Sequence, residues 1–150
     1  MARKAYVKEL PTFKAPGARR SRNMAAIKSV DTKPELYVRG ALYSSGFRYR
    51  LHSRSLPGRP DITLRRFRTV VLVQGCFWHG HKCRIGHIPR SNSDYWRAKI
   101  DRNVTRDARN TAEIQENGWR VAVIRECTLE EDTERLVNEL CSMKSRSKSS

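Results

Sequence analysis

The chain has 150 residues, which suits a single domain that buries roughly two-thirds of the surface exposed by its unfolded chain. Lys and Arg number 31 against 15 Asp and Glu, so the formal net charge is +16 at pH 7 and nucleic acid is the expected partner. No stretch approaches the ~18 consecutive apolar residues of a membrane span, and no basic amphipathic helix stands out, which argues against a membrane partner.

Both ends of the chain are basic and of low sequence regularity. Residues 1–30 contain eight Lys or Arg against one acidic residue, with prolines that break any periodicity. We expect residues 1–18 to be a flexible basic arm, residues 19–141 to form the folded domain, and the Ser-, Lys- and Arg-rich residues 142–150 to be a disordered tail. The N-terminus lacks the apolar segment of a secretory signal, which predicts a reducing, cytoplasmic compartment.

The first predicted helix begins at a capping signal. Thr32 and Glu35 have the spacing of a capping box, and Pro34 lies in the first helical turn. The helix should run to about Ser45 and end at Gly46.

A hairpin of two strands is expected next. The turn formed by residues 56–60 places Asp61 at the start of a short strand, 61–64, and residues 65–68 connect it to a partner strand, 69–74. This order predicts an α/β fold in which helices flank a small mixed central sheet. The remaining predicted elements are a helix over 94–117 in two pieces, a buried strand over 119–125 and an amphipathic helix over 129–140.

Residues 76–83 (CFWHGHKC) concentrate two thiols, two imidazoles and two aromatic rings directly after the second strand of this hairpin. Soft thiolates with one imidazole suit a tetrahedral structural zinc and do not suit magnesium. Two alternatives stay open: that Cys127 is only a buried small residue, and that His79 rather than His81 is the ligand. The candidate zinc ligands are Cys76, His81, Cys83 and Cys127.

Asp61 and His79 are candidates for metal binding and proton transfer. Asp61 offers a hard oxygen ligand for magnesium at a strand end, and hairpin pairing should bring it close to Val73 and Gln74. His79, if it is not a zinc ligand, is available for acid–base work.

Asp107 is a candidate partner for His79. It lies in an apolar stripe at helical spacing, so its carboxylate should face inward, where it needs a partner and can orient a histidine. The alternative is an ion pair with a nearby arginine. Asn103 would lie beside it, one turn earlier. The stripe is Ile100, Val104, Asp107, Thr111 and Ile114.

Six short segments, spread from about Arg19 to Cys127, resemble a known family in their order and spacing. They are Asn23-Met24, Ser55–Asp61, Gly75–His79, the His81 and Cys83 pair, Asn117–Val121 and Glu126-Cys127. Together they resemble the very short patch repair (Vsr) DNA mismatch endonucleases. The resemblance implies a restriction-endonuclease-like fold with a structural zinc, and a magnesium-dependent nick 5′ to the thymine of a T:G mismatch.

The resemblance also implies roles for individual residues. Asp61 would bind magnesium together with the main-chain carbonyl of Val73. His79 would be the general base, and Asp107 would orient it. Glu35 matches an acidic residue near the metal centre. The four zinc ligands would be the cysteines and the histidine named above.

Contacts to double-stranded DNA are implied for aromatic and basic residues. The family wedges aromatic rings into the duplex beside the mismatch, and Phe77, Trp78 and Trp96 match them. Core packing is the alternative, and it accounts for Trp96 as well as a DNA contact does. The other residues expected to contact DNA are Arg19, Arg20, Arg22, Asn23, Lys28 and Asn103.

Gln74 departs from the family pattern, since the best-known members have a histidine at this position. A glutamine can donate a hydrogen bond to a phosphate but cannot transfer a proton at neutral pH. His79 would then carry proton transfer alone. Two hypotheses follow: a monomeric mismatch nickase that acts at the nucleoid, or a zinc-stabilised nucleic-acid-binding module with weak or no nuclease activity.

Overall fold

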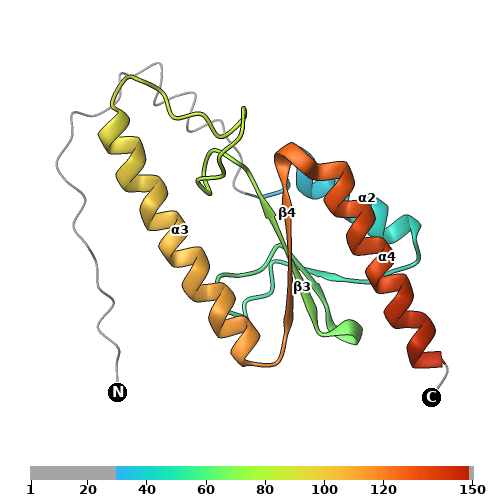
Figure 1. The fold of residues 1–150 in the computed structure, drawn as a ribbon. Coiled ribbons are helices and arrows are strands. Elements are labelled where there is room, and N and C mark those ends of the chain that lie inside the picture. Colours follow the sequence, from blue (N-terminus) through green and yellow to red (C-terminus); the bar gives the residue numbers. More distant parts are fainter. Residues whose placement is uncertain (1–29, 149–150) are drawn as a thin grey trace, which may run out of the picture.

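The computed structural model describes residues 30–148 as helices packed on both faces of a four-stranded mixed sheet (Figure 1). The sheet order is β1-β2-β3-β4; the first two pairings are antiparallel and β3 pairs with β4 in parallel. This confirms the predicted mixed sheet. The elements are α2 (Lys33–Ser44), β1 (Arg50–Leu51), β2 (Ile62–Leu64), β3 (Thr69–Gln74), α3 (Ser93–Glu116), β4 (Arg120–Arg125) and α4 (Leu129–Lys148).

Helix α2 begins and ends where its sequence signals predict. The Thr32 side chain accepts a hydrogen bond from the backbone N–H of Glu35, and a proline occupies the first turn. After Ser45, Gly46 takes a positive φ of 86°, a conformation that glycine adopts without strain. The face toward the sheet carries Glu35, Val38 and Leu42, all buried.

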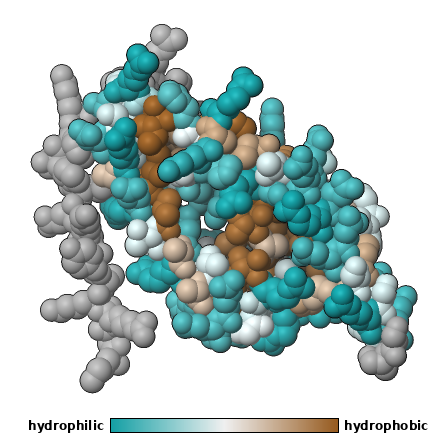
Figure 2. All heavy atoms as spheres, in the orientation of Figure 1, coloured by the Kyte–Doolittle hydropathy of each residue, from teal (hydrophilic) through white to brown (hydrophobic). Residues whose placement is uncertain are grey.

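The core lies between the sheet and the pair α2 and α4, while α3 covers the other face (Figure 1). All residues of β2 and the first half of β3 are buried, as expected for strands covered on both faces. Hydrophilic side chains cover most of the face shown in Figure 2, and apolar ones gather over α3 and over β4. The main core cluster is Val38, Leu42, Phe47, Ile62, Leu64, Val71, Ile124, Leu136 and Leu140.

Two predictions about helix length were wrong. Helix α3 is one continuous helix of 24 residues, because no Gly or Pro interrupts residues 93–116. Helix α4 does not end at Leu140: residues 142–148, expected to be disordered, continue it to Lys148. Met143 packs against the core, and its sulfur accepts a hydrogen bond from the Arg120 side chain. This last segment therefore has tertiary partners that its composition does not reveal.

Candidate active site and metal centre

Asp61 lies immediately before β2, beside the end of β3. Its Oδ2 accepts a hydrogen bond of 2.8 Å from the backbone N–H of Val73, which confirms the predicted closeness of these two positions. Burial raises the pKa of Asp61 from 3.8 to about 6; the negative charge of Glu35 acts in the same direction and the Val73 N–H opposes it. A carboxylate held at a strand end offers a hard oxygen ligand that fits a divalent cation. Gln74 ends β3 and is partly exposed.

His79 and Asp107 form a close pair between the loop after β3 and helix α3. Nδ1 of His79 lies 2.5 Å from Oδ2 of Asp107, and each side chain is about one-quarter to one-fifth exposed, at 24% and 21%. His79 is also close enough to Asp61 to interact with it electrostatically. Arg106 contacts Asp107 as well, at 3.4 Å, but this arginine is largely exposed. With Nδ1–H donated to the carboxylate, Nε2 is left to accept a proton.

Cys76, His81, Cys83 and Cys127 converge into one cluster, and their ligand atoms all lie within 4.8 Å of one another. Sγ of Cys127 is 3.4 Å from Nδ1 of His81. Three sulfur atoms and one imidazole nitrogen at these separations fit a tetrahedral metal ion. Burial raises the pKa of the Cys76 thiol to about 12, and a bound cation would reverse that shift.

The geometry bears on both alternatives raised for this cluster. His81 belongs to the cluster, whereas His79 pairs with Asp107. Cys127 lies exposed in a short 3₁₀ turn over Glu126–Thr128, so it is not a buried core residue. The fourth cysteine, Cys141, is exposed in α4 and outside the cluster.

The aromatic rings of Phe77, Trp78 and Trp96 form a single cluster between the loop and the first part of α3. Edge-to-face contacts join them at centroid distances of 4.9 to 6.2 Å. Both loop rings contact Trp96, although they are neighbours in sequence. Trp96 itself is buried, with 3% of its surface exposed, while the other two are partly exposed.

Asn103 supports the loop from helix α3. Its side-chain amide donates a hydrogen bond of 3.0 Å to the main-chain carbonyl of Trp78. Val104, expected to face inward, is instead 43% exposed. Gly80 of the loop packs against Val104 and Ile100. Part of the apolar stripe of α3 therefore packs against the loop.

Gly80 is a position where a larger residue should disturb the site. A Cβ atom there would lie 2.9 Å from Ile100 and 3.0 Å from Val104, and its φ of 66° disfavours any other residue. We expect Gly80→Ala to lower the free energy of unfolding by about 1–3 kcal/mol, because the loop that carries His79 would be displaced. Gly40→Ala is the matched control, since nothing lies within 4 Å of it in α2, and it should stabilise slightly. Urea unfolding of both variants tests this; equal stabilities would contradict it.

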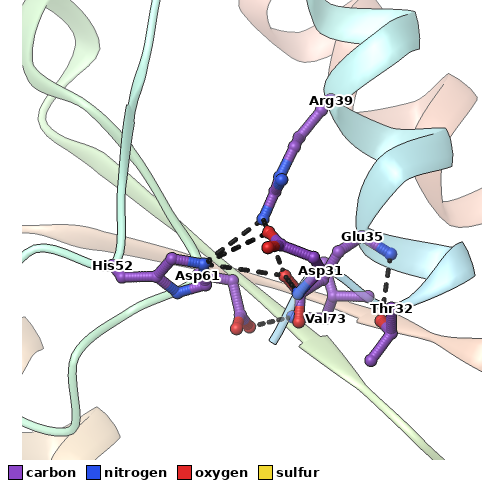
Figure 3. A network of polar contacts seen from close by, with 7 residues as sticks. All are labelled: Asp31, Thr32, Glu35, Arg39, His52, Asp61 and Val73. Carbon is purple, nitrogen blue, oxygen red and sulfur yellow. Dashed lines mark hydrogen bonds and ion pairs between the residues drawn. The ribbon is translucent and has the colours of Figure 1, made fainter. Parts of the chain in front are cut away.

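Glu35 lies next to Asp61 and is almost fully buried, with 2% of its surface exposed. Figure 3 shows it among Asp31, Arg39 and His52, which lie beside Asp61 on the α2 side. Neither Arg39 nor His52 was predicted from the sequence to belong to this site. The one available signal was that Glu35 and Arg39 are four residues apart on a helix.

The remaining predicted DNA contacts lie outside the described residues. These are Arg19, Arg20, Arg22, Asn23 and Lys28. Within residues 30–148, no helix combines the length and the apolar character needed to cross a bilayer.

A mixed α/β sheet with a carboxylate at a strand end, an oriented histidine and a basic surface defines the class of the protein as a nuclease. Comparison with known proteins gives the family. Residues 14–85 match the family described as DNA mismatch endonuclease Vsr. The chain is 40% identical over 132 residues to the DNA mismatch endonuclease Vsr of Escherichia coli strain K12, which covers 83% of this chain and 85% of that protein.

Two further relatives are named as nicking enzymes. The type II nicking enzyme V.XorIIP of Xanthomonas oryzae pv. oryzae is 50% identical over 111 residues, covering 74% of this chain and 82% of that protein. The type II nicking enzyme V.NmeAIP of Neisseria meningitidis is 45% identical over 129 residues, covering 82% and 92%. The chain therefore belongs to the Vsr family of DNA mismatch endonucleases, a family of DNA repair hydrolases.

Proposed function

We propose that this endonuclease makes a magnesium-dependent nick on the 5′ side of the thymine in a T:G mismatch, and that the nick initiates very short patch repair. The observation that carries the proposal is the His79–Asp107 pair at 2.5 Å, placed within electrostatic reach of Asp61. The relatives, a DNA mismatch endonuclease and two nicking enzymes, support a mismatched substrate and a cut in one strand.

Asp61, with the main-chain carbonyl of Val73, would hold the magnesium ion, whose charge when bound stabilises the scissile phosphate. His79 then acts as general base: Nε2 takes the proton of the attacking water while Nδ1–H remains bonded to Asp107. Gln74 would donate its side-chain amide to a phosphate oxygen, because it can donate but cannot transfer a proton. Glu35 would act through the charge that it adds beside Asp61.

The cluster of Cys76, His81, Cys83 and Cys127 would hold a structural zinc. Two of its ligands flank His79 in sequence, so the ion would fix the loop that carries the general base. A closed set of three thiolates and one imidazole leaves no open position for chemistry, which favours a structural role.

Phe77 and Trp78 would enter the duplex beside the mismatch, with the buried Trp96 behind them. Wedging rings between base pairs costs a few kcal/mol per unstacked step, and the cost is least where pairing is already imperfect. Asn103 would contact the DNA backbone beside the loop. Arg19, Arg20, Arg22, Asn23 and Lys28 would follow phosphates, so affinity should fall steeply with salt.

One active site is enough for a nick at a single asymmetric lesion, so we propose a monomer that works in the cytoplasm at the nucleoid. We also propose that residues 1–18 are an arm, residues 19–141 the endonuclease domain and residues 142–150 a tail. The tail is not disordered throughout, because residues 142–148 are helical.

The test is a nicking assay on a labelled duplex that contains one T:G pair. We expect a single cut 5′ to the thymine in the presence of Mg²⁺, no cut with excess chelator, and no cut in the matched T:A duplex. If both the T:G and the T:A duplex were cut, the proposed preference for a mismatch would be wrong. Binding without any cut would favour the alternative, a zinc-stabilised nucleic-acid-binding module.

A further inference from the structure

Two arginines have a left-handed backbone conformation. Within residues 30–148, the residues other than glycine with a positive φ are Asp31, His52, Arg59, Arg68 and Asn92. Asn, Asp and His adopt this conformation several-fold more often than other side chains do, so the two arginines are the exceptions. Because the conformation is costly for a residue with a Cβ atom, a compensating contact is expected for each of them.

Arg68 has such contacts within the fold. Its Nε donates a hydrogen bond of 3.3 Å to the carbonyl of Gly118, and its Nη2 donates one of 3.1 Å to the carbonyl of Asn117. The guanidinium also lies over the ring of Trp119, 5.3 Å from its centroid. The Arg68 side chain therefore joins the β2–β3 hairpin to the turn between α3 and β4, and it supports the fold.

Arg59 has no comparable contact. Its side chain is exposed and makes no hydrogen bond, ion pair or ring contact with any residue that the structure describes. Its backbone N–H donates to the carbonyl of Leu56 at 3.3 Å, which any residue except proline could do. Pro60 follows it, and a residue before proline favours extended backbone, which adds to the cost of a φ of 48°. The fold therefore does not explain why an arginine stands here.

The backbone of Arg59 is held firmly on both sides. On one side Gly58 packs against Asn110 of α3, so closely that a Cβ atom on Gly58 would lie 2.6 Å from Nδ2 of Asn110. On the other side Pro60 is fully buried. The turn is thus fixed in place, while the Arg59 side chain stays exposed.

Arg59 lies beside the proposed position of the scissile phosphate. It precedes Asp61 by two residues, so the two Cα atoms are at most about 7 Å apart. A guanidinium presents a planar set of donors that matches the oxygens of a phosphate group. No acidic side chain among the described residues pairs with it, so its charge is available to DNA.

We propose that Arg59 binds a phosphate that flanks the scissile bond. The inference rests on the proposed function, in which Asp61 holds the ion at that bond. A phosphate contact carries no sequence information, so it should place a T:G and a T:A duplex equally well on the active site. Bound DNA then supplies the partner that the fold does not give to this arginine.

The test uses Arg59→Asn, because asparagine removes the charge and fits the left-handed conformation. Binding is titrated with chelator present over about 50–200 mM salt. We expect the affinity for T:G and T:A duplexes to fall by the same factor, roughly tenfold, and the slope of log affinity against log salt to become shallower by about one. The melting temperature should equal or exceed that of the wild type. Arg59→Lys keeps the charge and should keep the slope.

Arg68→Asn is the matched control, since it makes the same substitution at the same backbone conformation. It should lower the melting temperature and leave the salt slope unchanged, because Arg68 lies at the opposite end of the hairpin from Asp61. Duplexes that carry one neutral methylphosphonate locate the contact. Neutralising the contacted phosphate should weaken wild-type binding as much as Arg59→Asn does, and should weaken Arg59→Asn no further.

Three results would overturn the inference. One is an Arg59→Asn protein with the salt slope of the wild type. Another is a fall in its melting temperature like that of Arg68→Asn, which would mean that the Arg59 side chain supports the fold. The third is a methylphosphonate scan around the cut in which both proteins lose affinity equally at every position. The proposed function fails separately, if Asp61→Asn nicks the T:G duplex at the wild-type rate.

Discussion

His79→Ala is expected to slow nicking of a T:G duplex by roughly 10²–10⁴-fold while leaving DNA affinity within about twofold, as for loss of a general base. The reason is that His79 is placed to take the proton of the attacking water, and Gln74 at the end of β3 cannot replace it. Single-turnover nicking rates and a binding titration with chelator measure the two quantities separately.

Asp107→Asn should give a smaller loss, roughly 10–100-fold, because the imidazole would keep its place but lose the carboxylate that selects its tautomer. His87→Ala is the matched control, since His87 is exposed and lies outside the His79–Asp107 pair, and its rate should be unchanged. A His79→Ala enzyme that nicks at the wild-type rate would contradict the assignment of the base.

Loss of zinc is expected to lower both stability and activity. Cys127→Ser should remove the bound zinc and lower the melting temperature by about 10 °C, given that 1 kcal/mol corresponds to roughly 2–4 °C in domains of this size. Cys127 is the ligand of choice because its thiol is exposed, so its replacement leaves the core intact.

The zinc content by elemental analysis and the melting curve measure this effect. Cys141→Ser is the control: it changes an exposed thiol outside the cluster and should alter neither quantity. Chelation of the wild type should reproduce the loss, and Zn²⁺ should restore it. The prediction would be contradicted if the purified wild type held no zinc and melted at the same temperature as Cys127→Ser.

Local signals in the sequence predicted those parts of the fold that depend on neighbouring residues. The cap of α2 and the turn before Asp61 each depend on residues only a few positions apart in sequence. Their geometry could therefore be inferred directly. The convergence of the three cysteines and one histidine was also predictable, because three of these four residues lie within eight positions.

The missed features depend on partners distant in sequence. Met143 of α4 packs on the core, which could not be inferred from the Ser- and Lys-rich composition around it. His52 appeared isolated, because its neighbours Asp31 and Glu35 precede it by about 20 residues and reach it only through the packing of α2 beside β1. Hydrophobic periodicity does not encode such polar contacts.

The continuous helix α3 carries the three residues that meet the loop: Trp96 touches its aromatic rings, Asn103 its backbone and Asp107 its histidine. They are seven and four residues apart, which sets them on one side of a straight helix about 16 Å apart from first to last. Inserting one residue between them would turn Asp107 by about 100° away from Trp96. The number of residues between them on α3 therefore fixes the distance between the aromatic rings and the His79–Asp107 pair.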